Sequence, residues 1–187
     1  MPKYCKEQTA MTLQQRLAAI RLVALDVDGV LTDGGIQIGR EGELFKRFNV
    51  RDGLGIKMLQ AAGIEVAIIT GRRSTIVEQR CAELGISRVT QGARIKIPAW
   101  DRLLEETGLT AVQVAYMGDD VPDLPLLQRA GLAATPADGS VDLDGIVHWR
   151  ASRNGGHGAV RELAELILKS RGLWDTLVRH TYCEFEA

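Results

Sequence analysis

Short apolar runs alternate along the chain with stretches in which apolar residues recur at helical spacing. The runs predict buried strands at residues 21–27, 64–70 and 112–118, and weaker strands at 88–91, 131–134 and 145–149. The periodic stretches predict helices at 12–20, 54–62, 74–84, 95–107, 124–130 and 158–170. Strands that are apolar throughout are typical of a parallel sheet covered by helices on both faces. The alternation therefore predicts an α/β protein, a Rossmann-like three-layer sandwich with a mostly parallel sheet.

One segment after the first strand does not follow this alternation. Residues 34–50 contain two apolar-rich stretches separated by the turn Gly39-Arg40-Glu41-Gly42, which predicts a β-hairpin insert. An isolated hairpin is only marginally stable in water. We therefore expect its apolar side chains to pack either on the parent domain or on the hairpin of another subunit. These side chains are Ile36, Ile38, Leu44, Phe48 and Val50.

The length and composition of the chain narrow the class of protein. A chain of 187 residues can bury a sizeable core, and we expect residues 1–187 to form a single domain. A formal net charge of −1 gives no sign of a nucleic-acid or membrane-surface partner. The three cysteines form no C-x-x-C pair, which favours a reducing, cytoplasmic location over a zinc or disulfide framework. Residues 1–10 lack the apolar core of a signal peptide, and no apolar run approaches the roughly 18 residues of a membrane helix.

Candidate chemistry begins at the end of the first predicted strand, in the run Asp26-Val27-Asp28-Gly29. Two aspartates that are two residues apart at a strand end project to the same side, and the carboxyl ends of strands line the crevice of an open α/β sheet. Such carboxylates repel each other unless a cation or a shared proton lies between them. Mg²⁺ is a hard cation that suits carboxylate and phosphate oxygens. Taken alone, the run can also be a simple turn, because short motifs occur by chance.

Three further segments add polar groups near strand or helix ends. Thr70-Gly71-Arg72-Arg73 offers a hydroxyl, a glycine amide and two cations, a combination suited to a phosphate group. A second acidic cluster, Gly118-Asp119-Asp120, follows the third strand, and Asp123 next to it is a plausible helix N-cap. Lys96 begins a helix, where a cation is unfavourable, which points weakly to function. A solvated surface lysine is the alternative interpretation for that position.

In this order, the four segments resemble the four motifs of the haloacid dehalogenase superfamily of phosphatases, and the resemblance spans residues 22–172. It implies that Asp26 is the nucleophile that forms an aspartyl-phosphate. It also implies that Asp28 is the general acid/base and that its backbone carbonyl helps to hold Mg²⁺. The other positions implied by the resemblance are the phosphoryl-binding Thr70 and Lys96, the Mg²⁺ ligands Asp26, Asp28 and Asp119, and the supporting acids Asp120 and Asp123.

A narrower resemblance adds the hairpin, the run Phe48-Asn49-Val50-Arg51-Asp52-Gly53 and residues 155–162. Together these are similar to the 3-deoxy-D-manno-octulosonate 8-phosphate phosphatases. The resemblance implies a Mg²⁺-dependent enzyme of lipopolysaccharide precursor synthesis without a large cap domain. It also implies a homotetramer in which the hairpins associate and each active site is completed by a neighbouring subunit. The implied substrate contacts are Asp28, Asn49, Val50, Arg51, Asp52, Gly53, Lys57, Arg72, Arg80 and Lys96. The family often has arginine where this chain has Lys57.

Other functions stay open at the level of the sequence. The cations Arg51, Lys57, Arg72 and Arg80 suit a substrate with two anionic groups, but they can equally lie on solvated helix faces. One alternative is a phosphatase of the same fold for another nonulosonate or small phosphate. Another is a catalytically idle assembly partner, although the set of catalytic residues is complete. A nucleotide-binding protein is disfavoured, because no G-x-x-x-x-G-K-[ST] or G-x-G-x-x-G run follows the first strand.

Overall fold

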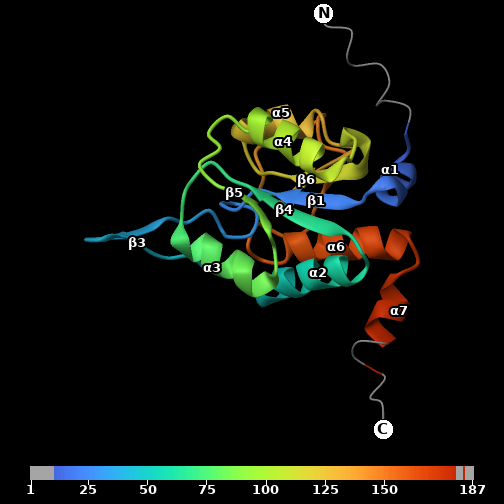
Figure 1. Ribbon diagram of the computed structural model, residues 1–187, viewed down its shortest axis with the longest axis horizontal. Helices are drawn as coiled ribbons and strands as arrows, with labels where there is room; N and C mark the ends of the chain where they lie inside the picture. The colour runs from blue at the N-terminus through green and yellow to red at the C-terminus, as the bar shows by residue number, and fades with distance from the viewer. Residues whose placement is uncertain (1–10, 180–182, 184–187) are drawn as a thin grey trace, which may run out of the picture.

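The computed structural model describes residues 11–179 and 183, and a six-stranded sheet forms its centre (Figure 1). The strand order is β5-β4-β1-β6-β7-β8, and every neighbouring pair is parallel. A parallel sheet built from strands that alternate with helices confirms the predicted α/β class. The strands are β1 (Leu22–Leu25), β4 (Glu65–Ile69), β5 (Arg88–Thr90), β6 (Val114–Met117), β7 (Leu132–Thr135) and β8 (Trp149–Arg150).

Helices cover both faces of this sheet, as the three-layer prediction required. In Figure 1, α4 and α5 lie above the sheet, whereas α2, α3 and α6 lie below it. The short helix α1 packs beside α6, and α7 follows α6 along the chain. The helices are α1 (Leu13–Ala19), α2 (Val50–Ala61), α3 (Thr75–Leu84), α4 (Ile97–Thr107), α5 (Leu124–Leu127), α6 (Ala159–Ser170) and α7 (Trp174–Val178).

The central strand β1 shows why its sequence is apolar throughout. Val23 and Leu25 belong to the core that includes residues of α2, α3 and α6, whereas Leu22 and Ala24 belong to the opposite core with Trp100 of α4. All four side chains of β1 are fully buried. Because successive side chains of a strand point to opposite faces, a strand covered on both faces needs apolar residues at every position.

The predicted hairpin insert is present but shorter than residues 34–50. It consists of the antiparallel strands β2 (Gln37–Gly39) and β3 (Gly42–Phe45), and it projects away from the sheet (Figure 1). The pairing stops after Phe45, and α2 begins at Val50 because the Asn49 side chain accepts a hydrogen bond from the Arg51 N–H at 2.8 Å. Helix α2 therefore begins four residues earlier than predicted and ends one residue earlier.

The apolar side chains of the hairpin are divided between two environments. Phe48 packs against the core of its own chain. Ile38 is 71% exposed, Leu44 is 62% exposed and Val50 is 80% exposed. The parent domain therefore covers Phe48 but leaves the others in solvent, so packing on the parent domain accounts for only part of the hairpin.

Some boundaries near the carboxyl end of the chain were predicted wrongly. Strand β8 spans Trp149–Arg150 instead of residues 145–149, because residues 144–146 form a turn in which the Ile146 and Val147 N–H groups donate to the Leu143 carbonyl. Helix α5 ends at Leu127 instead of residue 130, and α7 was not predicted. Within residues 11–179, no helix combines the length and the apolar character that crossing a bilayer requires. The single domain over 1–187 stays a prediction, because residues 1–10, 180–182 and 184–187 lie outside the described part.

Candidate active site

The register of the central strands aligns the predicted site segments at one edge of the sheet. Leu25 at the end of β1 pairs with Ile68 of β4 and with Met117 of β6. The Asp26 N–H then donates to the Met117 carbonyl at 3.0 Å, which continues the ladder by one residue. The residues that follow these three strands therefore emerge side by side, as expected for the carboxyl edge of a parallel sheet.

Three carboxylates meet at this edge. Asp26, Asp119 and Asp123 each offer an oxygen, and these atoms lie within 4.8 Å of one another. Asp26 is 8% exposed and Asp123 is 1% exposed. Gly29, at φ +83°, makes room for the cluster, because a side chain there would collide with the Asp119 carboxylate. From the sequence we expected Asp26 and Asp119 to meet as metal ligands, and we expected Asp123 to be only a supporting acid.

The electrostatics of this cluster fit a bound cation. Burial raises the pKa of Asp26 to about 6, even though the Lys96 charge opposes this shift. Burial, together with the charges of Asp26 and Asp123, raises the pKa of Asp119 to about 7. The Asp26 Oδ1 atom is buried and has no hydrogen-bond partner within the described part of the chain. An all-oxygen set of crowded carboxylates with an unpartnered oxygen is the kind of site that Mg²⁺ prefers.

Lys96 lies inside the cluster and is not a surface lysine. Its ammonium is 3.1 Å from Asp26 Oδ2 and 2.6 Å from Asp123 Oδ1, and it donates a hydrogen bond to the Tyr116 hydroxyl at 3.2 Å. The Lys96 side chain is 3% exposed. Burial alone would lower the pKa of Lys96, but the charges of Asp26 and Asp123 outweigh it and raise that pKa. The cation is therefore held in its charged form beside the predicted nucleophile.

Asp123 occupies the N-cap position of α5, as the sequence suggested, but its side chain makes no capping hydrogen bond to that helix. Its Oδ1 accepts hydrogen bonds from Lys96 and, at 2.5 Å, from the Tyr116 hydroxyl. Its Oδ2 accepts the Asp119 N–H at 3.0 Å. Asp123 thus fixes both Lys96 and the backbone of Asp119. Tyr116 was missed by sequence reasoning, although a hydroxyl in the middle of an otherwise apolar strand was a signal for it.

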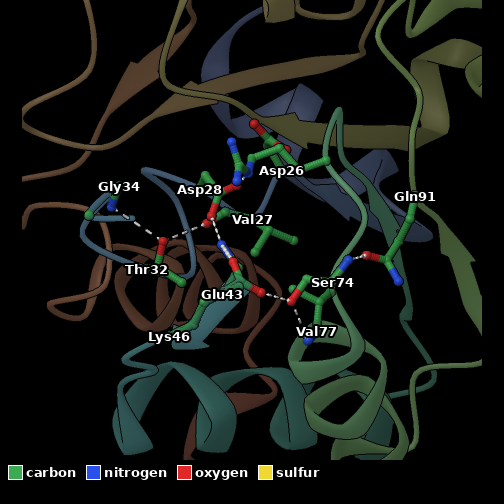
Figure 2. A network of polar contacts seen from close by, with 12 residues as sticks. Asp26, Val27, Asp28, Thr32, Gly34, Glu43, Lys46, Ser74, Val77 and Gln91 are labelled. Atoms are coloured by element: carbon green, nitrogen blue, oxygen red, sulfur yellow. Dashed lines mark hydrogen bonds and ion pairs between the residues drawn. The ribbon is translucent and has the colours of Figure 1, made fainter. Parts of the chain in front are cut away.

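Asp28 lies outside the three-carboxylate cluster, and its side chain turns toward the hairpin (Figure 2). Its Oδ1 accepts a hydrogen bond from the Lys46 ammonium, and its Oδ2 is 3.7 Å from Arg72 Nε. The predicted metal contact of Asp28 is through its backbone carbonyl, so this side-chain orientation does not conflict with it. Burial alone would lower the pKa of Lys46, but its hydrogen bonds to Asp28 and Glu43 outweigh burial and raise that pKa. Sequence reasoning gave Lys46 no role.

A cavity of about 690 Å³ opens beside Lys96. Such a volume is within the roughly 300–1,000 Å³ that is usual for small-ligand sites. Every charged residue that lines the cavity is a cation, so it suits an anionic ligand. Thr70, which precedes the loop at the cavity, is 2% exposed. The lining residues are Gly71, Arg72, Arg73, Gly92, Ala93, Arg94, Lys96 and Pro122.

Two of the predicted substrate contacts have clear structural roles within the chain. Asp52 is 1% exposed, and its carboxylate accepts the N–H groups of Gly158 at 3.1 Å and Arg161 at 2.8 Å, where α6 begins. Burial raises the pKa of Asp52. A side chain on Gly53 would collide with the guanidinium of Arg80. Asp52 therefore joins α2 to α6, and Gly53 allows Arg80 to pack closely on α2.

The other predicted substrate contacts are spread over the surface around α2 and α3. Arg80 is partly buried, lies over the Phe48 ring at 5.7 Å and pairs with Glu83 at 2.8 Å. Val50, Arg51 and Lys57 are exposed. The Lys57 ammonium lies near Gly85, at the end of α3 that is remote from Ser74. The structure therefore brings Asp28, Arg72 and Lys96 to the Asp26 edge, and it places Lys57 away from it.

The sequence is 47% identical over 156 residues to the 3-deoxy-D-manno-octulosonate 8-phosphate phosphatase KdsC of Escherichia coli strain K12, with 83% of each protein covered. The chain belongs to the 3-deoxy-D-manno-octulosonate 8-phosphate phosphatase family. This result confirms the narrower resemblance drawn from the sequence. No protein-family model matches the chain.

Similar solved structures show the wider superfamily to which this family belongs. A 3-deoxy-D-manno-octulosonate 8-phosphate phosphatase from Moraxella catarrhalis, in complex with a magnesium ion, a phosphate ion and a KDO molecule, matches with a TM-score of 0.86 and 41% identity, over 89% of this chain and 96% of that one. A putative HAD superfamily hydrolase from Legionella pneumophila matches with a TM-score of 0.86 and 41% identity, over 89% of this chain and 91% of that one. The chain is thus a member of the haloacid dehalogenase superfamily.

Proposed function

We propose that this protein hydrolyses 3-deoxy-D-manno-octulosonate 8-phosphate to 3-deoxy-D-manno-octulosonate and phosphate, with Mg²⁺ as cofactor. The observation that carries the proposal is the buried Asp26, with Lys96 at 3.1 Å and Asp119 beside it, at the carboxyl edge of the sheet. The 47% identity to a phosphatase of that name supports the choice of substrate. The reaction would belong to lipopolysaccharide precursor synthesis in the cytoplasm.

In the first half of the reaction, an oxygen of the Asp26 carboxylate attacks phosphorus and forms an aspartyl-phosphate. The ester P–O bond breaks, and Asp28 gives a proton to the leaving alkoxide oxygen. The Lys96 ammonium and the Thr70 hydroxyl donate hydrogen bonds to phosphoryl oxygens, and Lys96 offsets negative charge as it develops there. Because Lys96 is already held by Asp26 and Asp123, it needs little reorganisation to do so.

In the second half, water replaces the aspartate. Asp28, now a carboxylate, takes a proton from a water molecule as the water oxygen attacks phosphorus. The bond between phosphorus and the Asp26 oxygen breaks, which releases phosphate and restores the Asp26 carboxylate. Each proton that Asp28 gives in the first half is thus recovered in the second.

Asp26, Asp119 and the backbone carbonyl of Asp28 are the groups that would hold Mg²⁺. The unpartnered Asp26 Oδ1 and the raised pKa values of Asp26 and Asp119 support this assignment. When bound, the ion would supply positive charge against the phosphoryl oxygens. Asp123 stays with Lys96 in this scheme and keeps the ammonium beside the nucleophile.

We further propose a homotetramer in which hairpins associate and a neighbouring subunit completes each active site. The exposure of Ile38 and Leu44 supports association through the hairpin. Several predicted substrate contacts lie on the surface of their own chain, where they are available to another subunit. The exposed ones are Val50, Arg51 and Lys57, and Asn49 and Arg80 are partly exposed, whereas Asp52 and Gly53 are buried within their own chain.

The proposal is tested by measuring phosphate release from a panel of sugar phosphates, with Mg²⁺ and after chelation. We expect the highest kcat/KM for 3-deoxy-D-manno-octulosonate 8-phosphate and no turnover after chelation. Asp26→Asn should lose at least about 10³-fold, because the nucleophile is removed. The control Asp33→Asn, an acid of the same loop that pairs with Arg47, should stay within about twofold. Normal turnover by Asp26→Asn would refute the covalent mechanism, and a preference for another nonulosonate would refute the substrate alone.

A further inference from the structure

Lys46 is a buried cation that the proposed reaction does not use. Its side chain is 1% exposed, although it directly follows the exposed strand β3. Its ammonium donates to Asp28 Oδ1 and lies 3.0 Å from Glu43 Oε1. Ordering a long side chain and removing its charge from water are both unfavourable, so a buried lysine requires specific partners. One of its two partners here is the predicted general acid/base.

Glu43 holds Lys46 from the side opposite Asp28 (Figure 2). While Glu43 Oε1 faces Lys46, Glu43 Oε2 accepts a hydrogen bond from the Ser74 hydroxyl. The Ser74 N–H donates to Gln91 Oε1 at 2.8 Å. Because Ser74 caps α3 and Gln91 follows β5, this chain of contacts ties the Lys46 ammonium to the rigid body of the fold. The position of Lys46 is therefore set by more than the hairpin itself.

The two oxygens of Asp28 have different surroundings. Oδ1 is engaged by Lys46, whereas Oδ2 is 3.7 Å from Arg72 Nε, which is beyond hydrogen-bond distance. Arg72 lines the cationic cavity beside Lys96. A carboxyl group that is held by one oxygen has a fixed orientation and leaves the other oxygen available for proton transfer.

We propose that Lys46 is a positioning residue that holds Asp28 Oδ1, so that Oδ2 carries the proton to the leaving oxygen. The proposal rests on the proposed function. In the step concerned, the ester P–O bond breaks, the alkoxide takes the proton from Asp28 Oδ2, and Asp28 is left as a carboxylate. Lys46 touches neither substrate nor phosphorus and acts through Asp28. Glu43 supports Lys46 in turn.

The test compares two substrates that differ in their need for this proton. An alkoxide leaving group, as in the sugar-acid phosphate, requires protonation, whereas the nitrophenolate of p-nitrophenyl phosphate leaves without it. The quantity measured is kcat/KM, because it covers the steps up to the departure of the leaving group. For Lys46→Met we expect a loss of about 10- to 100-fold on the sugar-acid phosphate, within the range of general acid catalysis, and less than about threefold on the aryl phosphate.

Three variants show whether the effect passes through Asp28. Asp28→Asn should also lose more kcat/KM on the sugar-acid phosphate than on the aryl phosphate. Adding Lys46→Met to Asp28→Asn should lower kcat/KM little further, since the effects of coupled residues are not additive. Lys46→Arg should recover part of the loss on the sugar-acid phosphate. Arg47→Met is the matched control, because Arg47 is the next residue, is a cation and has a side chain that is 70% exposed. It should change neither substrate by more than about twofold.

Equal losses of Lys46→Met on both substrates, or full additivity with Asp28→Asn, would mean that Lys46 only anchors the hairpin. Should Lys46→Met fail to fold, Glu43→Gln replaces it: we expect a smaller loss with the same leaving-group dependence, and a loss without that dependence overturns the proposal. Failure of the proposed function looks different. In that case wild-type protein releases no phosphate from the sugar-acid ester, or Asp26→Asn stays active on both substrates.

Discussion

The buried centre, which consists of Asp26, Lys96, Asp119 and Asp123, differs from the β2–β3 hairpin in which kind of side chain it buries. In the centre, Lys96 and Asp123 are almost completely buried and bind each other at 2.6 Å. In the hairpin, Leu44 is 62% exposed, whereas Lys46 just after β3 is buried against Asp28. The centre thus encloses charge within one chain, while the hairpin presents apolar surface outward and turns its charge inward. Preorganised charge requires a rigid enclosure, and exposed apolar surface is typical of contact with another molecule.

Among the tests of this contrast, the largest expected effect concerns Asp123, which holds Lys96 in the centre. Asp123→Asn removes the charge that holds Lys96, and breaking a buried pair in this way typically costs about 3–5 kcal/mol of unfolding free energy. With its partner neutral, Lys96 should pair more closely with Asp26, and kcat/KM should fall by about 10²-fold or more. Denaturant unfolding and steady-state kinetics measure the two effects.

Asp101→Asn is the control for this variant, since Asp101 is an exposed acid of α4, outside the site. It should leave kcat/KM within about twofold of wild type. If both variants behaved alike, the enclosure of Lys96 by Asp123 would have no importance for the reaction.

The second prediction concerns pH and the crowded carboxylates of the centre. In the metal-free protein the pKa of Asp26 is about 6 and that of Asp119 is about 7, both above the ordinary value of 3.8. Raised carboxyl pKa values mean that stability present below about pH 4 is lost as pH rises through 6 to 7. Chelated protein should therefore melt several degrees lower at pH 8 than at pH 5.5, since 1 kcal/mol shifts Tm by about 2–4 °C at this size.

Mg²⁺ and Asp119→Asn should each weaken this dependence. The ion should raise Tm most at pH 8, because it binds the folded, ionised cluster. Asp119→Asn should flatten the pH profile of the chelated protein, because one repelling carboxylate is removed. Thermal unfolding by circular dichroism measures both. If the Tm of the chelated protein increased from pH 5.5 to 8, the carboxylates of the centre would not repel one another in the metal-free protein as described.

A smaller effect is expected at Asp52, which lies outside both regions, where α2 meets the start of α6. Asp52→Ala leaves the N–H groups of Gly158 and Arg161 without their acceptor, which should lower the free energy of unfolding by about 1–3 kcal/mol. The folded variant should keep its KM. A raised KM with unchanged stability would instead support the predicted substrate contact of Asp52. Asp101→Ala, at an exposed position of α4, is the control and should stay within about 0.5 kcal/mol.

The local pattern of apolar residues was enough to predict the sheet and to predict that Asp26 and Asp119 meet at one of its edges. The continuous apolar run of β1 indicated a strand covered on both faces, and parallel strands necessarily bring Asp26 and Asp119 to one edge. The limits of helices and strands were harder to predict, because Asn49 starts α2 early and a turn at residues 144–146 delays β8. Such limits depend on single hydrogen bonds, which periodicity does not record.

The partners of the charged residues were harder to predict than their positions. Lys46 meets Asp28 across 18 residues of sequence, and Tyr116 meets Lys96 across 20. Both contacts join segments that are brought together by the tertiary fold. The sequence gives the position of each of these residues, but it does not show which other segment supplies the partner.

The smallest effect on the chain itself is expected in the hairpin. Ile38→Ser combined with Leu44→Ser should change the unfolding free energy of the isolated subunit by about 0.5 kcal/mol or less, because both side chains are exposed. The same variant should show a lower mass than wild type by light scattering, since each buried Ile or Leu contributes about 1.5–3 kcal/mol to an interface. Val141→Ser, which removes an apolar side chain that is 78% exposed elsewhere, should keep the wild-type mass. Equal masses for all three proteins would mean that the outer face of the hairpin is ordinary surface, and the contrast with the centre would then rest on Lys46 alone.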